Sequence, residues 1–254
     1  MKPEAPGTML QMMYLSERIK RNKWKSFYEI GCGKGIFSNL FLSNGLTGDA
    51  IDLNPRACER SEELNQKSIS SKSYSVSNGD FMTVSKDKKY DVLFSCMVIE
   101  HIPEEPRQKF LEKCKTLLTE NGRIAFLVPA SMKHWGVEDE IAGHLLRYEK
   151  EDVYKLAENL GMKVDHIVGL TYPISNWLFR LSNYIVSKNE SKMLDKSQQE
   201  KTIYTGSREV MFKTDFPSYT AIILNRVLLY PLHLLQKMFS NKRESMVLYF
   251  ELTK

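Results

Sequence analysis

The feature that most constrains this chain is a glycine-rich turn between an apolar run and a predicted helix. Residues 27–35 read Phe-Tyr-Glu-Ile-Gly-Cys-Gly-Lys-Gly, and Asp52 closes the next apolar run. Glycines let the backbone approach a ligand closely, and a carboxylate after the second strand can accept hydrogen bonds from a ribose diol. The pattern therefore predicts a strand–helix–strand unit with a nucleotide-binding crevice at its edge.

The spacing of the glycines narrows the choice of nucleotide. A dinucleotide fingerprint requires Gly-x-Gly-x-x-Gly, but Ile36 occupies the place of the third glycine, and Glu29 stands just ahead of the run. A carboxylate would repel a pyrophosphate, whereas it would attract a positively charged amino-acid tail. The turn therefore favours S-adenosylmethionine over a nicotinamide dinucleotide.

Further motifs follow in order along the chain, and together they resemble the class I S-adenosylmethionine-dependent methyltransferases of small-molecule and glycan-associated type. Each motif alone is weakly specific, but their order and spacing fit alternating strands and helices over roughly residues 15–170. The matching segments are 29–35, 50–54, 78–81, 90–96, 98–102 and 121–129.

The pattern between residues 26 and 128 alternates β-rich runs with amphipathic helices, which predicts right-handed crossovers and a parallel sheet. With the resemblance, we expect an α/β fold. It would be a Rossmann-like, doubly wound, seven-stranded sheet with an antiparallel last strand, plus a mostly helical insertion before that strand. The expected organisation is a single methyltransferase domain (1–254) with a cofactor-binding core (9–170), an insertion or lid (171–245) and a terminal strand (246–254).

Local signals place several helix ends. Asn54 is positioned to cap a helix over 55–67, with Pro55 in its first turn, and Gly161 closes a helix over 149–160. These signals need only neighbouring residues, so we expect them to hold in the fold.

The resemblance implies that S-adenosylmethionine is the cofactor and S-adenosylhomocysteine the product. Glu29 would act on the amino-acid end of the cofactor, directly or through the turn, and Asp52 would accept both ribose hydroxyls. Asp80 and Phe81 would bracket the adenine, although Phe81 and Tyr14 could equally be packing residues. The expected cofactor-binding residues are Tyr14, Glu29, Gly31, Cys32, Gly33, Asp52, Leu53, Asp80, Phe81, Ser95 and Met97.

His101 is one candidate catalytic residue. It lies just past the predicted fourth strand, at the carboxyl edge where open α/β folds bind ligands. Imidazole titrates near neutrality, which suits a general base. A role in orienting the cofactor or the loop, and a purely structural role, stay open.

A second candidate site lies in residues 133–148, after the predicted fifth strand. This stretch resembles a Gly-His-x-Arg-Arg-Tyr signature of methyltransferases found with glycosyltransferases, with Leu146 in place of the first arginine. His144 is the candidate acceptor-side base, or else it ties this loop to the following helix together with Tyr148. The expected substrate-binding residues are His134, Trp135, Arg147 and Tyr148.

We expect no metal ion. Asp139, Glu140 and His144 are the one set of neighbours in this stretch that we considered as metal ligands, and we prefer the base or structural reading for His144. The four cysteines show no Cys-x-x-Cys spacing that would suggest a zinc site.

The apolar segment 221–239 admits three interpretations. Its length suits a membrane span, but Arg226 inside it would cost roughly 2.5–3.5 kcal/mol and Pro231 would kink the helix. A lid helix over the substrate pocket is the interpretation we prefer. A helix that lies on a membrane surface or binds a partner is the other, and basic and aromatic residues around the segment keep the membrane surface open.

Taken together, the sequence predicts an S-adenosylmethionine-dependent methyltransferase that works by in-line displacement. The acceptor we expect is a hydroxyl of a sugar, polysaccharide or lipid-linked intermediate. A quinone-like or other small aromatic metabolite is the alternative, and a non-catalytic cofactor-binding subunit is another.

Other functions and locations are disfavoured. Residues 95–98 read Ser-Cys-Met-Val and lack the Pro-Pro-aromatic motif of enzymes that methylate nucleic-acid amines, and a net charge of +5 is mild for a duplex binder. The start of the chain has no signal-peptide pattern. We expect a cytoplasmic protein, with peripheral contact to the inner membrane face through 221–239 as an option.

Overall fold

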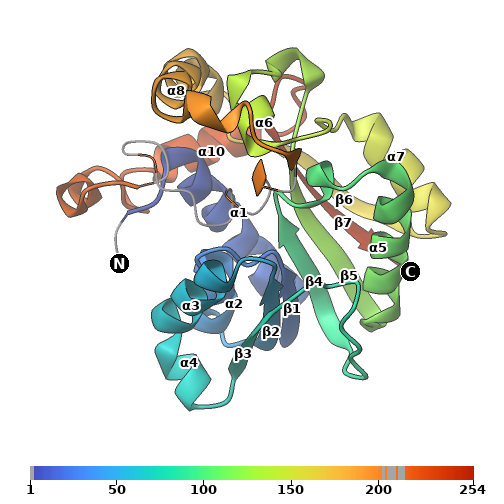
Figure 1. Ribbon diagram of the computed structural model, residues 1–254. Helices are drawn as coiled ribbons and strands as arrows, with labels where there is room; N and C mark the ends of the chain where they lie inside the picture. Colours follow the sequence, from blue (N-terminus) through green and yellow to red (C-terminus); the bar gives the residue numbers. More distant parts are fainter. Residues whose placement is uncertain (1–2, 199, 202–203, 205–209, 211–214) are drawn as a thin grey trace.

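The computed structural model describes residues 3–198, 200–201, 204, 210 and 215–254. Figure 1 shows one twisted sheet with helices on both of its faces. The strands are β1 (Ser26–Ile30), β2 (Thr47–Asp52), β3 (Tyr74–Asn78), β4 (Tyr90–Cys96), β5 (Leu118–Pro129), β6 (Lys163–Leu170) and β7 (Val247–Thr253). The α-helices are α1 (Pro6–Asn22), α2 (Ile36–Ser43), α3 (Pro55–Leu64), α4 (Gln66–Ser70), α5 (Glu104–Thr116), α6 (Val137–Ala142), α7 (Lys150–Asn159), α8 (Ile174–Glu190) and α10 (Tyr230–Met238).

The sheet has the order β3-β2-β1-β4-β5-β7-β6, and this confirms the predicted fold class. The first five strands pair in parallel, whereas β7 runs antiparallel between β5 and β6. The strand order reverses between β1 and β4, which puts a topological switch point at the carboxyl ends of these two strands. Ligands of open α/β sheets bind at that edge.

The core consists of two apolar layers, one on each face of the sheet. Alternate residues of one strand enter different layers, so that Tyr28 joins one cluster and Phe27 the other. Helices α5 and α7 cover the first cluster, and α1 and α2 cover the second. These four helices thus hold their places mainly by burying apolar side chains.

Most local end signals are confirmed. The side chain of Asn54 accepts a hydrogen bond from the backbone N–H of Arg56, and Pro55 is the first residue of α3. Gly161 has a φ of +58° just after α7. The helix expected over 55–67 ends earlier, because the chain turns at Asn65 before α4 begins.

A buried charge cluster fastens α1 to the sheet. Glu251 on β7 is fully buried, and Arg18 of α1 donates two hydrogen bonds to its carboxylate, of 2.6 and 2.9 Å. Arg123 on β5 and Asn22 donate to the same carboxylate, and the hydroxyl of Tyr249 does as well. These partners come from three distant parts of the sequence.

The insertion leaves the sheet after β6 and returns at β7. Its described part is mostly helical, as expected, while residues 199, 202–203, 205–209 and 211–214 of the expected 171–245 segment lie outside the described residues. Figure 1 shows α8 and α10 beside α1, away from β3. The insertion therefore covers the α1 side of the molecule.

The single helix expected over 221–239 is wrong. Residues Ser218–Ile222 form a short 3₁₀ turn, further turns follow, and α10 begins only at Tyr230, with Pro231 in its first turn. Proline fits the first turn of a helix, where its missing N–H is not needed, so it starts a helix here instead of kinking one. Among the described residues, no helix has both the length and the apolar character needed to cross a membrane.

Candidate active site

The glycine-rich turn lies at the carboxyl end of β1 and leaves no room for a side chain at Gly31. Gly31 has a φ of +76°, and a Cβ atom there would come within 2.4 Å of Cγ2 of Val98. The Gly31 N–H donates to the carbonyl of Ile51 on β2 over 2.8 Å. The turn is therefore held between β2 and the segment that follows β4, at the switch point of the sheet.

Asp52 braces this turn with its carboxylate. Oδ2 accepts a hydrogen bond of 2.8 Å from the N–H of Gly33, and Oδ1 accepts one of 2.9 Å from the N–H of Asn54. Burial raises the pKa of Asp52, and these two N–H groups oppose the rise. Each carboxylate oxygen has a second acceptor position, so Asp52 and its exposed neighbour Leu53 suit the predicted contact with a ribose.

Glu29 contacts helix α2 through a buried hydrogen bond. It is almost fully buried, and one carboxylate oxygen accepts a hydrogen bond from the hydroxyl of Ser38, which in turn accepts one of 2.8 Å from Tyr74. Burial raises the pKa of Glu29 to about 8, although Ser38 opposes that rise. The contact that the structure shows is with α2, which begins directly after the turn, and an action of Glu29 on the cofactor stays a prediction.

Asp80, Phe81 and Tyr14 each have protein partners. Asp80 accepts a hydrogen bond of 2.8 Å from the N–H of Met82, and the ring of Phe81 is buried in the aromatic core. The hydroxyl of Tyr14 lies 2.8 Å from Nε2 of His166 on β6, at the far side of the sheet from β1. The structure gives these side chains packing or turn roles, and their contacts with the cofactor stay predictions.

The end of β4 carries two unusual residues. The hydroxyl of Ser95 is buried and has no hydrogen-bond partner among the described residues. Met97 adopts a φ of +55°, which is strained for a residue with a side chain, and its N–H donates to the carbonyl of Leu127 over 2.9 Å. Cys32 is buried in the neighbouring turn. Unpaired polar atoms and strain of this kind are found at ligand sites.

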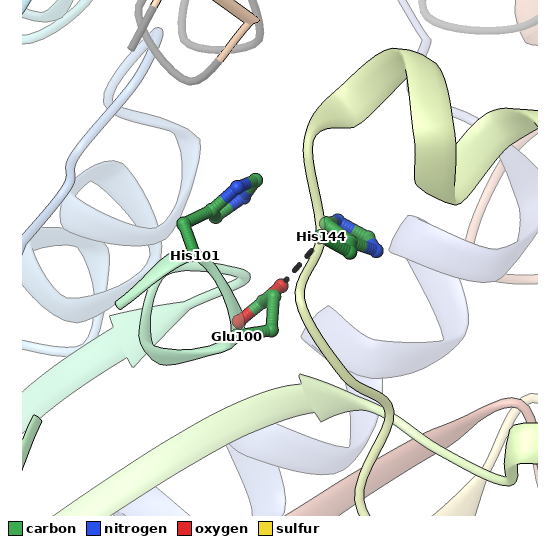
Figure 2. A group of neighbouring side chains, drawn as sticks. All are labelled: Glu100, His101 and His144. Atoms are coloured by element: carbon green, nitrogen blue, oxygen red, sulfur yellow. Dashed lines mark ion pairs between the residues drawn. The ribbon is translucent and has the colours of Figure 1, made fainter. Parts of the chain in front are cut away.

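Three further side chains meet just beyond this point, and Figure 2 shows them together. Glu100 and His101 lie on the 3₁₀ turn after β4, and His144 lies on the loop after α6. The ring centroids of His101 and His144 are 4.8 Å apart, and Nε2 of His144 lies 3.7 Å from Oε1 of Glu100. One potential ligand atom from each residue lies within 4.8 Å of the others, so this group could hold a metal ion.

Asp139 fixes His144 in place. Its Oδ1 lies 2.7 Å from Nδ1 of His144 and also accepts a hydrogen bond of 2.9 Å from Nε of Arg147. Arg147 donates a second bond to the carbonyl of Ala130 over 3.1 Å. Two of the five N–H donors of the guanidinium are therefore engaged within the protein, and its contact with substrate stays a prediction.

Glu100 and His101 are both buried, and burial shifts the pKa of each. Burial, together with the nearby His144, lowers the pKa of His101 to about 4. Burial raises the pKa of Glu100 to about 7, although His144 opposes the rise. Both carboxylate oxygens of Glu100 are buried without a hydrogen-bond partner among the described residues. Such an orphaned carboxylate is costly, so it points to a missing partner.

The predicted substrate residues do not form one group. Nε2 of His134 lies 3.2 Å from the amide of Asn176 on α8, and Trp135 is half-buried next to it. The hydroxyl of Tyr148 is buried in the core and accepts a hydrogen bond of 3.3 Å from Arg107. His134 thus lies against the insertion, whereas Tyr148 anchors the loop.

Sequence reasoning missed Glu100 and Asp139 as site residues. Glu100 belongs to the segment 98–102 that carried the resemblance, but only His101 was selected from it. Asp139 was considered only as a metal ligand. Its separation of five residues from His144 could have indicated the hydrogen bond that the two side chains form. The pairing of Glu100 with His144 depends on the sheet order, which local patterns do not encode.

Comparison with known proteins gives a consistent picture. A family model described as "Methyltransferase domain" matches residues 11–167. A ubiquinone biosynthesis O-methyltransferase from Nitrosomonas europaea is 24% identical over 184 residues, which cover 67% of this chain and 77% of the relative. The protein of the same name from Pasteurella multocida is 24% identical over 146 residues, covering 54% of this chain and 60% of the relative.

Solved structures share the fold at low identity. Magnesium protoporphyrin IX methyltransferase from Synechocystis PCC 6803, with bound S-adenosylhomocysteine, superposes with a TM-score of 0.54 at 14% identity, covering 65% of this chain and 78% of the other. A putative sarcosine dimethylglycine methyltransferase from Galdieria sulphuraria has a TM-score of 0.53 at 17% identity and covers 77% of this chain and 79% of the other.

Proposed function

This chain belongs to the methyltransferase-domain family and is an S-adenosylmethionine-dependent methyltransferase, and on that premise we propose that it methylates a hydroxyl of a quinone-like or other small aromatic metabolite. The names of the two relatives at 24% identity support this class of acceptor. The sugar or lipid-linked acceptor is the second candidate, and it rests on the local resemblance of residues 143–148.

One observation carries the assignment of a hydroxyl acceptor. The Glu100–His101–His144 group lies just past β4, and Val98 of the same segment packs against the glycine turn. Groups that can take or hold a proton therefore stand beside the predicted cofactor crevice. A hydroxyl must lose its proton to attack a methyl group well, whereas a neutral amine or a thiolate needs no such help.

The methyl-transfer step itself requires few further catalytic groups from the protein. The sulfonium already activates the methyl group, so alignment of donor and acceptor can supply most of the acceleration, on the order of 7–11 kcal/mol. In our proposal the glycine turn and Asp52 hold the donor, and His101 and His144 act on the acceptor hydroxyl. The acceptor oxygen forms a bond to the methyl carbon while the carbon–sulfur electron pair stays on sulfur and yields S-adenosylhomocysteine.

The test is transfer of labelled methyl from S-adenosylmethionine to defined acceptors. The panel contains catechol, a dihydroxybenzoic acid and a hydroxylated quinone on one side, and methyl glycosides and a lipid-linked sugar on the other. We expect label in the aromatic acceptors and none with Asp52→Ala. Label only in the sugars would overturn the aromatic proposal in favour of the second candidate, and no label above the Asp52→Ala blank in either set would overturn both.

We also propose that the surface around residues 219–228 contacts the membrane. Tyr219, Ile222, Ile223 and Val227 are each at least 66% exposed, and the one charged residue among 216–236 is Arg226. Exposed apolar and aromatic side chains with a basic residue suit the interface of an anionic bilayer. Co-sedimentation with anionic vesicles should fall in an Ile222→Ser, Ile223→Ser variant, and equal binding by that variant would contradict the contact.

A further inference from the structure

The orphaned carboxylate of Glu100 is the starting point. Its side chain is fully buried, and neither oxygen has a hydrogen-bond partner among the described residues. A buried carboxylate without a partner is strongly unfavourable, so a native site of this kind is completed by a cation or a ligand. The nearest cationic candidate is His144, whose Nε2 remains 3.7 Å away.

The hydrogen bonds of His101 and His144 engage Nδ1 of each ring and leave Nε2 available to bind a metal ion. Nδ1 of His144 faces the carboxylate of Asp139, and Nδ1 of His101 faces the carbonyl of Gly143 at 3.1 Å. Both partners are acceptors, so both Nδ1 atoms carry the proton and both Nε2 atoms keep a lone pair. Histidines that ligate metals are typically held in this way, by a carboxylate or a carbonyl on the other nitrogen.

Hydrogen bonds join the residues that surround this group. Asp139 is buried and is held by Arg147 as well as by His144, and it also accepts a hydrogen bond from the N–H of Gly136. The positive charge of Arg147 thus balances the negative charge of Asp139. The negative charge of Glu100 remains to be balanced by a ligand. Two imidazoles and one carboxylate form a ligand set for a first-row divalent metal with open coordination positions.

We propose that Glu100, His101 and His144 bind a divalent transition-metal cation at the acceptor side of the active site. The binding itself stands on the geometry, while its chemical use rests on the proposed function. A hydroxyl of the acceptor takes an open position on the cation, which lowers the pKa of that hydroxyl. The proton passes to solvent water, the oxygen attacks the methyl group, and the electron pair of the broken carbon–sulfur bond remains on sulfur. In this arrangement His101 and His144 act as ligands.

The experiment measures metal binding without any acceptor. Full-length, tag-free protein is stripped with a chelator, titrated with Zn²⁺ in a calorimeter, and titrated with Co²⁺ while its visible absorption is followed. We expect one equivalent of Zn²⁺ to bind and Co²⁺ to give the d–d bands of a nitrogen- and oxygen-ligated site. Wild-type protein that binds neither cation at one equivalent would overturn the proposal.

Variants locate the site. Glu100→Gln and His144→Gln should each abolish the stoichiometric binding, and Asp139→Asn should weaken it about 10–100-fold because that residue only orients a ligand. His166→Gln, on β6 outside the group, is the matched histidine control and should bind like wild type. Circular dichroism and binding of S-adenosylhomocysteine verify that each variant is folded. Unchanged binding by folded Glu100→Gln and His144→Gln would refute the site.

Two outcomes separate this inference from the proposed function. If one cation binds but no hydroxyl acceptor is methylated, the metal site stands and the proposed acceptor class fails. If the chelated enzyme binds no cation and methylates an aromatic hydroxyl at the full rate, the proposed function stands and the metal site fails.

Discussion

Asp52 braces the glycine turn, and the predicted second role is to bind the ribose of the cofactor. A hydrogen bond to a charged group contributes about 1.5–3 kcal/mol, so loss of two ribose contacts in Asp52→Ala should weaken S-adenosylhomocysteine binding by a factor on the order of 10²–10⁴. Asp52→Asn, which keeps one acceptor oxygen, should show a smaller loss. Calorimetric affinity unchanged in both variants would remove Asp52 from the binding site.

Glu29 should make stability depend on pH. Its folded pKa is about 8, above the ordinary value of 4.5, so the folded state holds the proton more tightly than the unfolded state does. The free energy of unfolding is therefore highest below about pH 4.5 as far as this group is concerned, and its contribution falls as pH rises towards 8. Glu29→Gln stays neutral and should flatten the slope in urea unfolding measured across that range. An identical slope in wild type and variant would show that Glu29 ionises normally.

At the residue scale, the sequence predicted best where a residue's role depends on its immediate neighbours. The positions of Gly31 in the turn after β1 and of Asp52 at the end of β2 were predictable because a glycine turn and the acid that follows it are local signals. Glu100 was missed because its significance depends on His144, which approaches only when β5 lies beside β4 in the sheet. The hydrophobic periodicity of one sequence carries no information about a contact between two such distant segments.

The turn after β1 and the 3₁₀ turn after β4 are fitted to each other, which predicts a coupled pair of variants. Gly31→Ala would put a methyl group 2.4 Å from Cγ2 of Val98, in a backbone conformation that alanine disfavours. We expect it to weaken cofactor binding strongly. Gly31→Ala with Val98→Ala removes the clash but keeps the strain of the positive φ, and should recover binding in part.

The control for this pair is Val98→Ala alone, which opens space without strain and should bind the cofactor nearly as wild type does. Binding by Gly31→Ala that matches wild type would mean that the two turns move apart at little cost. If the double variant loses cofactor binding completely, the backbone strain at Gly31 accounts for the whole effect of Gly31→Ala.

At the scale of elements, helix ends were predictable where the stop signal is local. The cap at Asn54 and the left-handed Gly161 fall where the sequence placed them. The single helix predicted over 221–239 was wrong because the prediction rested on apolar composition alone. In the structure Pro231 lies at the start of a helix, and the preceding residues form turns. Which apolar side chains are buried there depends on contacts with α1, and composition does not reveal them.

For the whole molecule, the cluster around Glu251 should carry much of the stability. Removing one partner of a buried ion pair costs about 3–5 kcal/mol, and we expect Arg18→Met to lie near the lower end because Arg123 still faces the carboxylate. Arg21→Met, on the exposed side of the same helix, is the matched control and should change stability little. Urea unfolding monitored by circular dichroism gives both values, and equal stability of the two variants would contradict this role.

The position of β7 also sets an order of assembly during synthesis. Strand β6 is not hydrogen-bonded to β5, because β7 lies between them. A ribosome therefore releases β6 and then the whole insertion before the strand that joins β6 to the sheet exists. Closure of this half of the sheet is a late, non-local event, and until then the apolar face of β6 must be shielded by other means, such as a chaperone or the insertion itself.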